Sequence, residues 1–361
     1  MTMEITVTKT QCPKPKPEDE SKLGFARTFS DHMFVIEHDA GRGWYDPRIV
    51  PYQKIALDPA SPVFHYAQEI FEGAKAYALD NGEVGLFRIR DNAERMNRSA
   101  DRMCMPPLDT DLQVEAINRL VDLDRDWVPK SEGTSLYLRP AMIADGSSLG
   151  AHTATRFIYF IICSPTGTYY QQGMKPIRIR IETRHVRAVK GGVGRAKTGG
   201  NYAASFKASF RAKEDGFNEV LWLDGREQKY VQEVGAMNMM FVIDGKIVTS
   251  ELGDTILPGI TRDSVITLAK EKGMEVIEGR IAVDYLFDAY EKGLLTEAFG
   301  TGTAAVISPV GKLAWNERTM ILNNFVIGPV SLMFYEELVG IQRQRRPDTH
   351  GWTTVVPRYN N

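Results

Sequence analysis

One glycine-rich stretch in the middle of the chain limits local folding more than any other feature of the sequence. Residues 191–200 read GGVGRAKTGG and contain a single lysine, Lys197. Glycine adopts backbone conformations, and permits close approach of a bulky group, that other residues forbid. The stretch is therefore predicted to be a loop that meets a ligand, although a lone lysine in such a loop is more often a solvated surface residue.

A phenol and a carboxylate follow this lysine in the sequence. Tyr202 comes five residues after the lysine, and Glu233 lies in the otherwise apolar segment VQEVGAMNMM. An enzyme that uses pyridoxal 5′-phosphate needs an amine for the Schiff base, a phenol for the ring oxygen and a carboxylate for the ring nitrogen. Lys197, Tyr202 and Glu233 supply these groups, whereas the alternative for Glu233 is an ordinary carboxylate at a strand end on the surface.

The same loop nearly matches a nucleotide-binding motif. Residues 191–198 resemble the phosphate loop GxxxxGK[ST], whose backbone N–H groups surround phosphates. Ala196 stands where that motif requires glycine, and two glycines follow Lys197-Thr198 where the motif requires the start of a helix. A non-enzymatic phosphate- or nucleotide-binding module nevertheless remains the alternative from a different class of protein.

Two further turns and one arginine suit anions. Residues 257–262 (LPGITR) predict a turn followed by a helix, whose first N–H groups can bind phosphate, although Thr261 could simply cap the helix. Residues 299–304 (FGTGTA) form a second small, glycine-rich turn with hydroxyls. Arg95 lies on a predicted helix, either as a solvated arginine or as a bidentate phosphate contact.

Length and composition exclude several classes of protein. A chain of 361 residues is longer than one hydrophobic core ordinarily supports, so two domains are expected. A hydrophobic content of 43% and a net charge of −2 fit a soluble globular protein, with neither nucleic acid nor a membrane as partner. No apolar run approaches the roughly 18 residues of a spanning helix, and the polar N-terminus lacks a signal core.

Cysteine and histidine usage indicates the compartment and the absence of a metal site. The three cysteines, Cys12, Cys104 and Cys163, are odd in number and widely spaced, which fits a reduced cytoplasmic protein. The histidines show no spacing typical of metal ligands, so no metal site is predicted.

Mixed strands, helices and hairpins predict the α+β class and not a doubly wound parallel sheet. Strands are expected at 33–38, 84–88, 155–163, 177–182, 219–223, 238–243 and 246–249. Helices are expected from a cap at Asp91 to Pro106, and at about 111–126, 201–213, 261–272, 282–291 and 328–344. The expected domains are a small N-terminal α+β domain over 1–167, with a loose lead-in over 1–22, a connection over 168–177 and a large domain over 178–361.

Short motifs along nearly the whole chain resemble, in order, those of the branched-chain amino acid aminotransferases. The resemblance runs from GFARTFSDHM (24–33) to GWTTVV (351–356). Between them stand HY (65–66), IFEGAKA (70–76), SLYLRP (135–140), SSLG (147–150) and the lysine, glutamate, LPGITR and FGTGTAAV motifs. The resemblance implies the α+β, two-domain fold type IV of the pyridoxal phosphate enzymes, similar to D-amino acid aminotransferase. The cofactor would lie between the smaller N-terminal domain and the larger, cofactor-binding one.

The resemblance also implies a role for individual residues around pyridoxal 5′-phosphate. Lys197 would form the Schiff base and then shuttle a proton between the substrate and the cofactor, while Tyr202 meets the ring oxygen and Glu233 the ring nitrogen. The groups implied for the phosphate are Arg95, Arg187, the amides of Ile260 and Thr261, and Thr303. For the substrate they are the amides of Ala236 and Ala304, the pocket residues Phe71, Tyr137 and Tyr169, Tyr66 and Leu149 of a partner subunit, and Arg139 for the second carboxylate of glutamate.

The implied reaction is reversible, ping-pong transamination of L-leucine, L-isoleucine and L-valine with 2-oxoglutarate, in a cytoplasmic homodimer. Its small-molecule partners would be amino acids and 2-oxo acids. Two departures from vertebrate relatives stand out, because those carry threonine at position 236 and a CxxC pair where this chain has Ala305 and Ser308. A hydroxyl contact near the substrate carboxylate and thiol-based regulation at that place are therefore not expected.

Two further interpretations compete with this one. D-amino acid transamination or aminodeoxychorismate lyase activity would use the same fold, but the long N-terminal region and the SLYLRP and FEGAKA motifs favour the branched-chain enzymes. An inactive relative that keeps the fold only for interaction is disfavoured, because Lys197, Tyr202 and Glu233 are all present.

Overall fold

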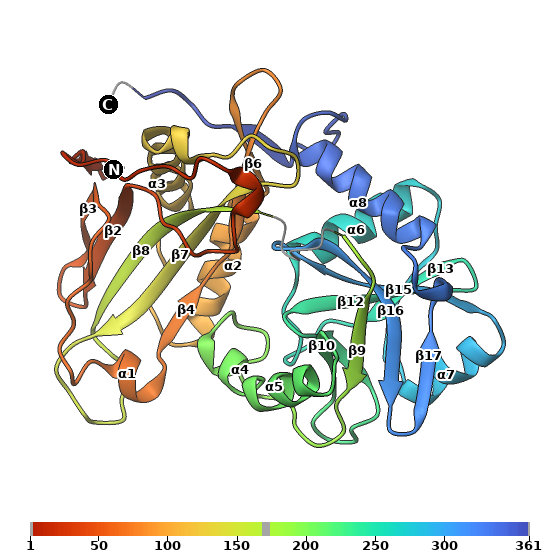
Figure 1. Ribbon diagram of the computed structural model, residues 1–361. Coiled ribbons are helices and arrows are strands. Elements are labelled where there is room, and N and C mark those ends of the chain that lie inside the picture. The colour runs from red at the N-terminus through yellow and green to blue at the C-terminus, as the bar shows by residue number, and fades with distance from the viewer. Residues whose placement is uncertain (1–2, 168–173, 360–361) are drawn as a thin grey trace. The chain divides into compact units, whose positions relative to one another are not determined.

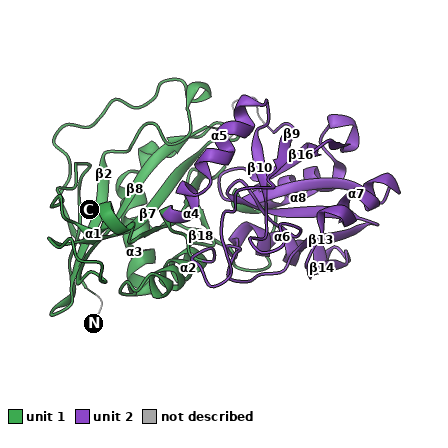
Figure 2. Ribbon diagram, turned by 90° about the horizontal axis from the view of Figure 1, so that it is seen from below, with its two compact units in different colours: residues 1–171, 196–199, 340–361 green, residues 172–195, 200–339 purple. Residues whose placement is uncertain are grey.

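The computed structural model describes residues 3–167 and 174–359 (Figure 1). The chain forms two compact units, coloured separately in Figure 2. Unit 1 takes residues 1–171, 196–199 and 340–361, and unit 2 takes 172–195 and 200–339. Unit 1 thus includes the C-terminal segment and the residues around Lys197, which the division of the sequence at 167 had assigned to the second domain.

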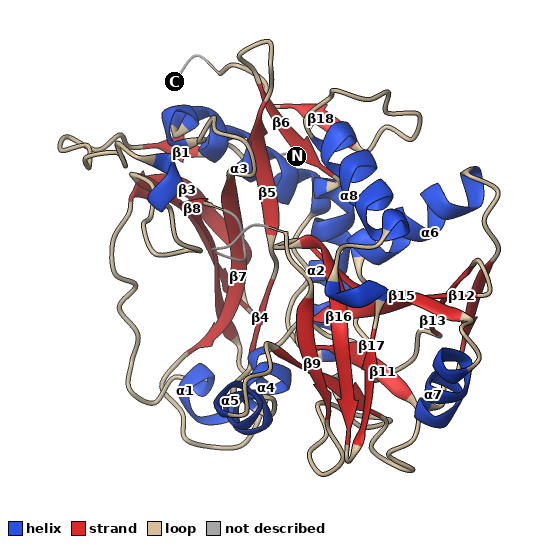
Figure 3. Cartoon of the chain, turned by 45° about the vertical axis from the view of Figure 1, so that its right-hand side comes forward, coloured by secondary structure: helices blue, strands red, loops and turns tan. Residues whose placement is uncertain are grey.

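Unit 1 is built on a single mixed sheet, whose strands are coloured red in Figure 3. Its strand order is β1 (Thr6–Val7), β3 (Gly43–Pro51), β2 (His32–Asp39), β8 (Arg156–Thr166), β7 (Ser135–Asp145), β5 (Ala74–Ala78), β6 (Val84–Phe87) and β18 (Thr353–Val355), with the short strand β4 (Glu69–Phe71) paired to β7. The C-terminal strand β18 pairs with β6, which explains why the end of the chain belongs to this unit.

Helices α2 (Ile89–Arg102) and α3 (Thr110–Leu123) pack their apolar faces on one side of this sheet. Leu136 and Leu138 of β7 join that core. Because side chains alternate along a strand, Tyr137 and Arg139 point to the opposite face of the sheet. The remaining helical segments of unit 1 are η1 (Glu20–Lys22), α1 (Pro62–Tyr66) and η2 (Arg125–Trp127).

Unit 2 contains a second large sheet. Its order is β11 (Val231–Val234), β10 (Glu219–Leu223), β9 (Ile177–Ile181), β16 (Val306–Trp315), β15 (Leu295–Gly302), β12 (Met237–Ile243), β13 (Lys246–Ser250) and β14 (Val276–Gly279), with β17 (Arg318–Ile321) paired to β16. An additional pairing joins β11 to β12, so the strands from β11 to β12 close into a ring. The β11–β12 turn therefore lies beside the end of β15, because Asn238 of β12 is paired with Thr301 of β15.

Helices and short helical segments between and after these strands complete unit 2. They are α4 (Gly199–Ala203), which begins at the boundary between the units, α5 (Phe206–Glu214), α6 (Ile260–Glu271), α7 (Val283–Glu291), the short η3 (Asn323–Phe325) and α8 (Pro329–Gln342), which continues into unit 1. No helix in the described ranges has the length and apolar character needed to cross a bilayer.

Several expected elements are confirmed and three details differ. The strand over 219–223 and the hairpin around Asp244-Gly245 form as predicted. The prediction of a single helix over 201–213 is wrong, because the helix is interrupted between α4 and α5. There the Ser205 hydroxyl donates to the Tyr202 carbonyl at 2.6 Å.

The other two differences lie in unit 1. Asp91 does not cap α2, because Arg88 adopts φ 51° and the helix begins at Ile89. Asp91 lies within the first turn and pairs with Arg88 at 2.7 Å. The first 22 residues are not loose throughout, since β1 pairs with β3 and Ile5 is buried in the core.

Candidate active site

The backbone of Lys197 is held on both sides within unit 1. Its N–H donates to the hydroxyl of Ser99 on α2 at 3.0 Å, and its carbonyl accepts the N–H of Phe71 on β4 at 3.0 Å. The side-chain amine lies 5.2 Å from the centre of the Phe71 ring. Lys197 is half-buried, so it is not a freely solvated loop lysine.

A buried ion pair lies next to this lysine. The guanidinium of Arg95 donates to both carboxylate oxygens of Glu72, at 2.7 and 2.8 Å, and both side chains are nearly inaccessible. Asn92 donates to the same carboxylate at 2.8 Å. Burial alone would raise the pKa of Glu72, but the charges of Arg95 and Lys197 outweigh it and hold that pKa below its ordinary value. The interpretation of Arg95 as a solvated arginine is therefore wrong.

Three of the predicted substrate residues form one cluster, here called the Phe71 cluster: Phe71, Tyr137 and Arg139. The Arg139 guanidinium lies 4.7 Å from the Phe71 ring centre and donates to the Tyr137 hydroxyl at 3.1 Å. A Cβ at Gly73 would lie 2.1 Å from that hydroxyl, so only glycine fits there. The Arg139 Nε is buried and has no hydrogen-bond partner among the described residues.

Glu233 lies in unit 2, on β11, and is only 3% exposed. One carboxylate oxygen accepts the N–H of Leu257 at 2.7 Å, and the other lies 3.1 Å from Nε of Arg187. Arg187 also donates to the carbonyls of Gly194 (3.1 Å) and Thr255 (2.5 Å). The alternative interpretation of Glu233 as a surface carboxylate is therefore wrong, and Arg187 contacts this carboxylate directly.

The start of α6 carries two of the predicted phosphate contacts. Gly259 is the N-cap residue and no side chain caps the helix, so Thr261 does not serve as a cap. A Cβ at Gly259 would lie 2.0 Å from Asn238 Oδ1, while the amide nitrogen of Asn238 donates to the Leu257 carbonyl at 2.9 Å. Asn238 thus fixes the turn before Ile260, at the positive end of the helix dipole.

Two turns at one end of the unit 2 sheet carry Ala236 and Ala304. Ala236 follows Gly235, which adopts φ 55°, and Ala304 follows the end of β15. The second turn closes at Val306, a β-branched residue at φ 62°, which costs about 1–3 kcal/mol of strain. Such strain is common where backbone groups are held for binding.

Three more of the predicted residues lie on described segments, and a fourth does not. Tyr202 is half-buried on α4. Tyr66 and Leu149 are exposed on unit 1, at 43% and 66%, and the Tyr66 hydroxyl donates to the Leu149 carbonyl at 2.6 Å. Tyr169 lies outside the described residues.

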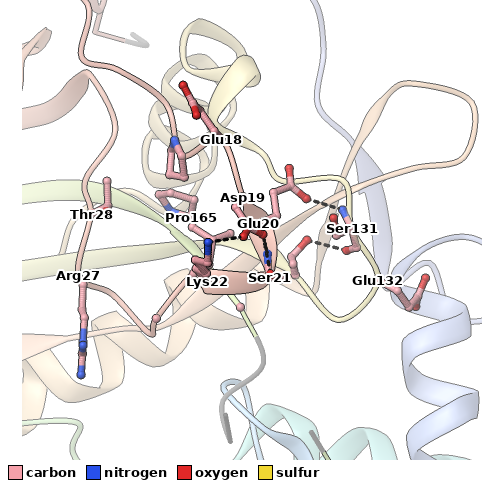
Figure 4. Close-up of a pocket in the computed structure, with 15 residues that line it drawn as sticks. Glu18, Asp19, Glu20, Ser21, Lys22, Arg27, Thr28, Ser131, Glu132 and Pro165 are labelled. Carbon is pink, nitrogen blue, oxygen red and sulfur yellow. Dashed lines mark hydrogen bonds and ion pairs between the residues drawn. The ribbon is translucent and has the colours of Figure 1, made fainter. Parts of the chain in front are cut away.

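The sequence did not indicate Glu69, Glu72 and Ser99 as parts of this site. Glu72 stands in the IFEGAKA motif, which was the one available signal, while Glu69 precedes it and Ser99 lies on α2. A separate hollow of about 770 Å³ in unit 1 (Figure 4) is lined by η1 and neighbouring segments and contains none of the predicted site residues.

Comparison with known proteins identifies the family. The model of the family "Amino-transferase class IV" matches residues 69–313. Branched-chain-amino-acid aminotransferase 2 of Bacillus subtilis (strain 168) is 50% identical over 355 residues, which span 98% of this chain and 97% of that protein.

Solved structures agree with this match. The crystal structure of the Escherichia coli branched-chain amino acid aminotransferase gives a TM-score of 0.75 at 26% identity, covering 90% of this chain and 99% of that one. The T.th. branched-chain amino acid aminotransferase with pyridoxamine 5′-phosphate gives 0.74 at 29% identity, covering 93% and 99%. The chain therefore belongs to the class IV aminotransferases of fold type IV, and within them to the branched-chain-amino-acid aminotransferases.

Class IV aminotransferases use pyridoxal 5′-phosphate, and the residues of this chain fit that cofactor. A lysine amine lies against an aromatic ring, a buried carboxylate is present that suits a charged ring nitrogen, and the start of α6 has no side-chain cap. The hydroxyl of Thr301, next to the turn that carries Thr303, is buried without a hydrogen-bond partner among the described residues. The enzyme is thus a pyridoxal phosphate-dependent aminotransferase.

Proposed function

We propose that this enzyme transfers the amino group of L-leucine, L-isoleucine and L-valine to 2-oxoglutarate, by a ping-pong mechanism in which one site serves both half-reactions. The observation that carries the proposal is that the Lys197 amine and the Arg139 guanidinium both lie against the ring of Phe71, at 5.2 and 4.7 Å. An amine for the reaction and a cation for a distal carboxylate thus share one largely apolar surface. The names of the relatives support the choice of substrates.

Lys197 is the proposed base. When bound, the cofactor withdraws electrons from the substrate Cα and so makes its proton acidic. The Lys197 amine would take that proton and later give it up again, while the two backbone hydrogen bonds keep residue 197 in place. Tyr202 is proposed to donate to the ring oxygen.

Glu233 is proposed to hold the ring nitrogen in its protonated form. Its carboxylate is fixed by Arg187 and by the N–H of Leu257, so it can offer a negative charge without reorganising. A carboxylate in this position, instead of a neutral acceptor, favours proton removal at Cα.

The phosphate is proposed to bind positively polarised groups. The proposed contacts are Arg95, Arg187, the amides of Ile260 and Thr261, and the hydroxyl of Thr303. The uncapped start of α6 supports the amide contacts. Arg95 already neutralises Glu72 and Arg187 already contacts Glu233, so each arginine would serve a protein carboxylate as well as the phosphate.

The substrate is proposed to use three kinds of contact. The amides of Ala236 and Ala304 would bind the α-carboxylate, and their turns lie at the same end of the paired strands β12 and β15. Phe71 and Tyr137 would contact the aliphatic side chain, and Tyr169 stays an expectation for the same pocket. Arg139 would bind the second carboxylate of glutamate or 2-oxoglutarate, which gives the apolar cavity a polar edge.

A cytoplasmic homodimer is the proposed assembly. Phe64, Tyr66 and Leu149 of unit 1 are all exposed, at 61%, 43% and 66%. Exposed apolar residues of this size suit contact with another subunit, and the resemblance implies that Tyr66 and Leu149 reach the partner's site.

The visible absorption spectrum of the purified protein tests the proposed function directly. We expect a yellow cofactor band that bleaches with L-leucine and returns with 2-oxoglutarate. A band that responds only to a D-amino acid would keep the fold and overturn the substrate. No band, even after addition of pyridoxal 5′-phosphate, would overturn the enzyme and favour the phosphate-binding module.

A further inference from the structure

The segment after Lys197 is held by a strand from a distant part of the chain. β4 makes two contacts with it, of which the first is the Phe71 N–H to the Lys197 carbonyl, at 3.0 Å. In the second, the carboxylate of Glu69 accepts the N–H of Gly199 and, at 3.5 Å, the hydroxyl of Thr198. One short strand therefore fixes three consecutive residues that begin with the lysine.

The backbone of Gly199 lies directly against the Glu69 carboxylate. A Cβ at that position would lie 2.4 Å from Oε1 of Glu69, so a side chain there would displace the end of the Glu69 side chain. The backbone of Glu69 is held in the sheet, because its N–H donates to the Ala67 carbonyl at 2.9 Å and it is paired with Ile143 of β7. The glycine after Lys197-Thr198 thus lets a carboxylate approach the backbone.

The charge of Glu69 also points to a specific role. Burial raises the pKa of this carboxyl, while the Gly199 N–H, the Thr198 hydroxyl and the charge of Arg139 act in the opposite direction. A half-buried carboxyl is unfavourable unless hydrogen bonds compensate for its lost hydration. Here the compensating groups belong to the loop that carries the reactive lysine.

We propose that Glu69 is a positioning residue, which holds the backbone of Thr198 and Gly199 so that the Lys197 amine starts each proton transfer from one defined place. The inference rests on the proposed function of Lys197. Without the carboxylate, Phe71 and Ser99 still bind residue 197, but the chain after it is released. A displacement of about 1 Å at a reacting group can cost about 100-fold in rate.

The experiment compares Glu69→Ala with Glu69→Gln in the holoenzyme. The glutamine keeps an acceptor oxygen for the Gly199 N–H, whereas alanine removes it. Glu20→Ala is the matched control, because the Glu20 carboxylate also accepts backbone N–H groups, that of Lys130 and that of Ser131, the latter shown in Figure 4. These contacts lie in a part of unit 1 without predicted site residues. The measurements are amide hydrogen exchange of residues 197–200, and kcat and KM for L-leucine.

For Glu69→Ala we expect exchange at Gly199 to accelerate at least about tenfold, and kcat to fall about 10- to 100-fold with KM for L-leucine changed less than about threefold. Glu69→Gln should restore both quantities to within about threefold of the wild type. Glu20→Ala should leave both unchanged.

Two results would overturn the inference. The first is a Glu69→Ala variant with the exchange rate and kcat of the wild type, and the second is a Glu69→Gln variant as impaired as Glu69→Ala. A wild-type protein without a cofactor band would overturn the proposed function instead. In that case, the exchange rates of Gly199 would still decide whether Glu69 holds the loop.

Discussion

Lys197 in unit 1 and Glu233 in unit 2 are held in opposite ways. For Lys197 the backbone is fixed, by Ser99 and Phe71, while the amine at the end of the side chain rests against an aromatic ring. For Glu233 the side chain itself is fixed, by the Arg187 guanidinium and the Leu257 N–H. A group that carries a proton between two atoms must move, whereas a group that keeps a ring nitrogen charged must stay still. The two environments suit the roles proposed for these two residues.

We expect the Lys197 side chain to be needed for turnover and to contribute little to the stability of the fold. Lys197→Ala should reduce kcat by about 10⁴-fold or more, because the general base is lost. The variant keeps the backbone hydrogen bonds of residue 197 to Ser99 and Phe71, so we expect the thermal midpoint of the apoenzyme to change little. Steady-state kinetics and thermal unfolding measure the two effects.

The exposed Lys190, in the same loop, provides the control for this variant. Lys190→Ala should behave as the wild type in both assays. If Lys197→Ala strongly destabilised the apoenzyme, the lysine side chain would be needed to hold the loop. Lys197 and Glu233 would then both be held through their side chains.

Glu233 should affect both turnover and folding. Glu233→Ala should retain some cofactor but lose about 100-fold or more in kcat, because the ring nitrogen loses its charged partner. Removing one partner of a buried ion pair leaves Arg187 uncompensated, so the free energy of unfolding should fall by about 3 kcal/mol. Gln232→Ala, on the other side of β11, serves as the control.

Cofactor content, kcat and chemical denaturation of these variants are the measurements. Near-normal turnover of Glu233→Ala would remove Glu233 from the mechanism. An unchanged stability would show instead that the ion pair with Arg187 does not hold the side chain.

A substitution of Arg139 tests whether the Phe71 cluster distinguishes 2-oxoglutarate from L-leucine. Arg139→Gln removes the cation beside Phe71 and Tyr137. We expect KM for 2-oxoglutarate to rise about 10- to 100-fold, as expected for loss of a charge-assisted hydrogen bond, and KM for L-leucine to change less than about threefold. Half-reactions followed by absorbance separate the two substrates.

Arg156→Gln is the control for this variant, because Arg156 lies on β8 of the same sheet with an exposed side chain. It should leave both KM values unchanged. An equal rise in KM for leucine and 2-oxoglutarate would mean that Arg139 supports the pocket instead of recognising the second carboxylate.

The sequence predicted the local features of this molecule better than its long-range contacts. The strand expected at 177–182 forms as β9, and the glycines before Lys197 lie in a loop as expected, because each of these features depends on neighbours in the chain. The contact of Glu69 with Gly199 joins residues 130 positions apart, and that of Ser99 with Lys197 spans 98. The hydrophobic periodicity of a sequence cannot predict such pairs, because they form only when the sheet and α2 bring distant segments together.

The turn beside Glu233 provides the smallest and most selective test. Glu219 of β10 approaches Gly235 so closely that a Cβ there would lie 2.4 Å from its carboxylate. Burial raises the pKa of Glu219 to about 7, although Lys213 opposes this shift. A carboxyl with a raised pKa in the folded state binds its proton more tightly there than in the unfolded chain. The stability that it contributes is therefore present at low pH and is lost as the pH rises from about 4.5 to about 7.

Glu219→Gln should remove this pH dependence. The free energy of unfolding of the wild type, measured by denaturant at pH 5 and pH 8, should fall by about 2 kcal/mol more than that of the variant. If wild type and Glu219→Gln lost stability in parallel, the titrating group would lie elsewhere, and the buried Glu219 carboxyl beside this turn would not be the source of the pH dependence.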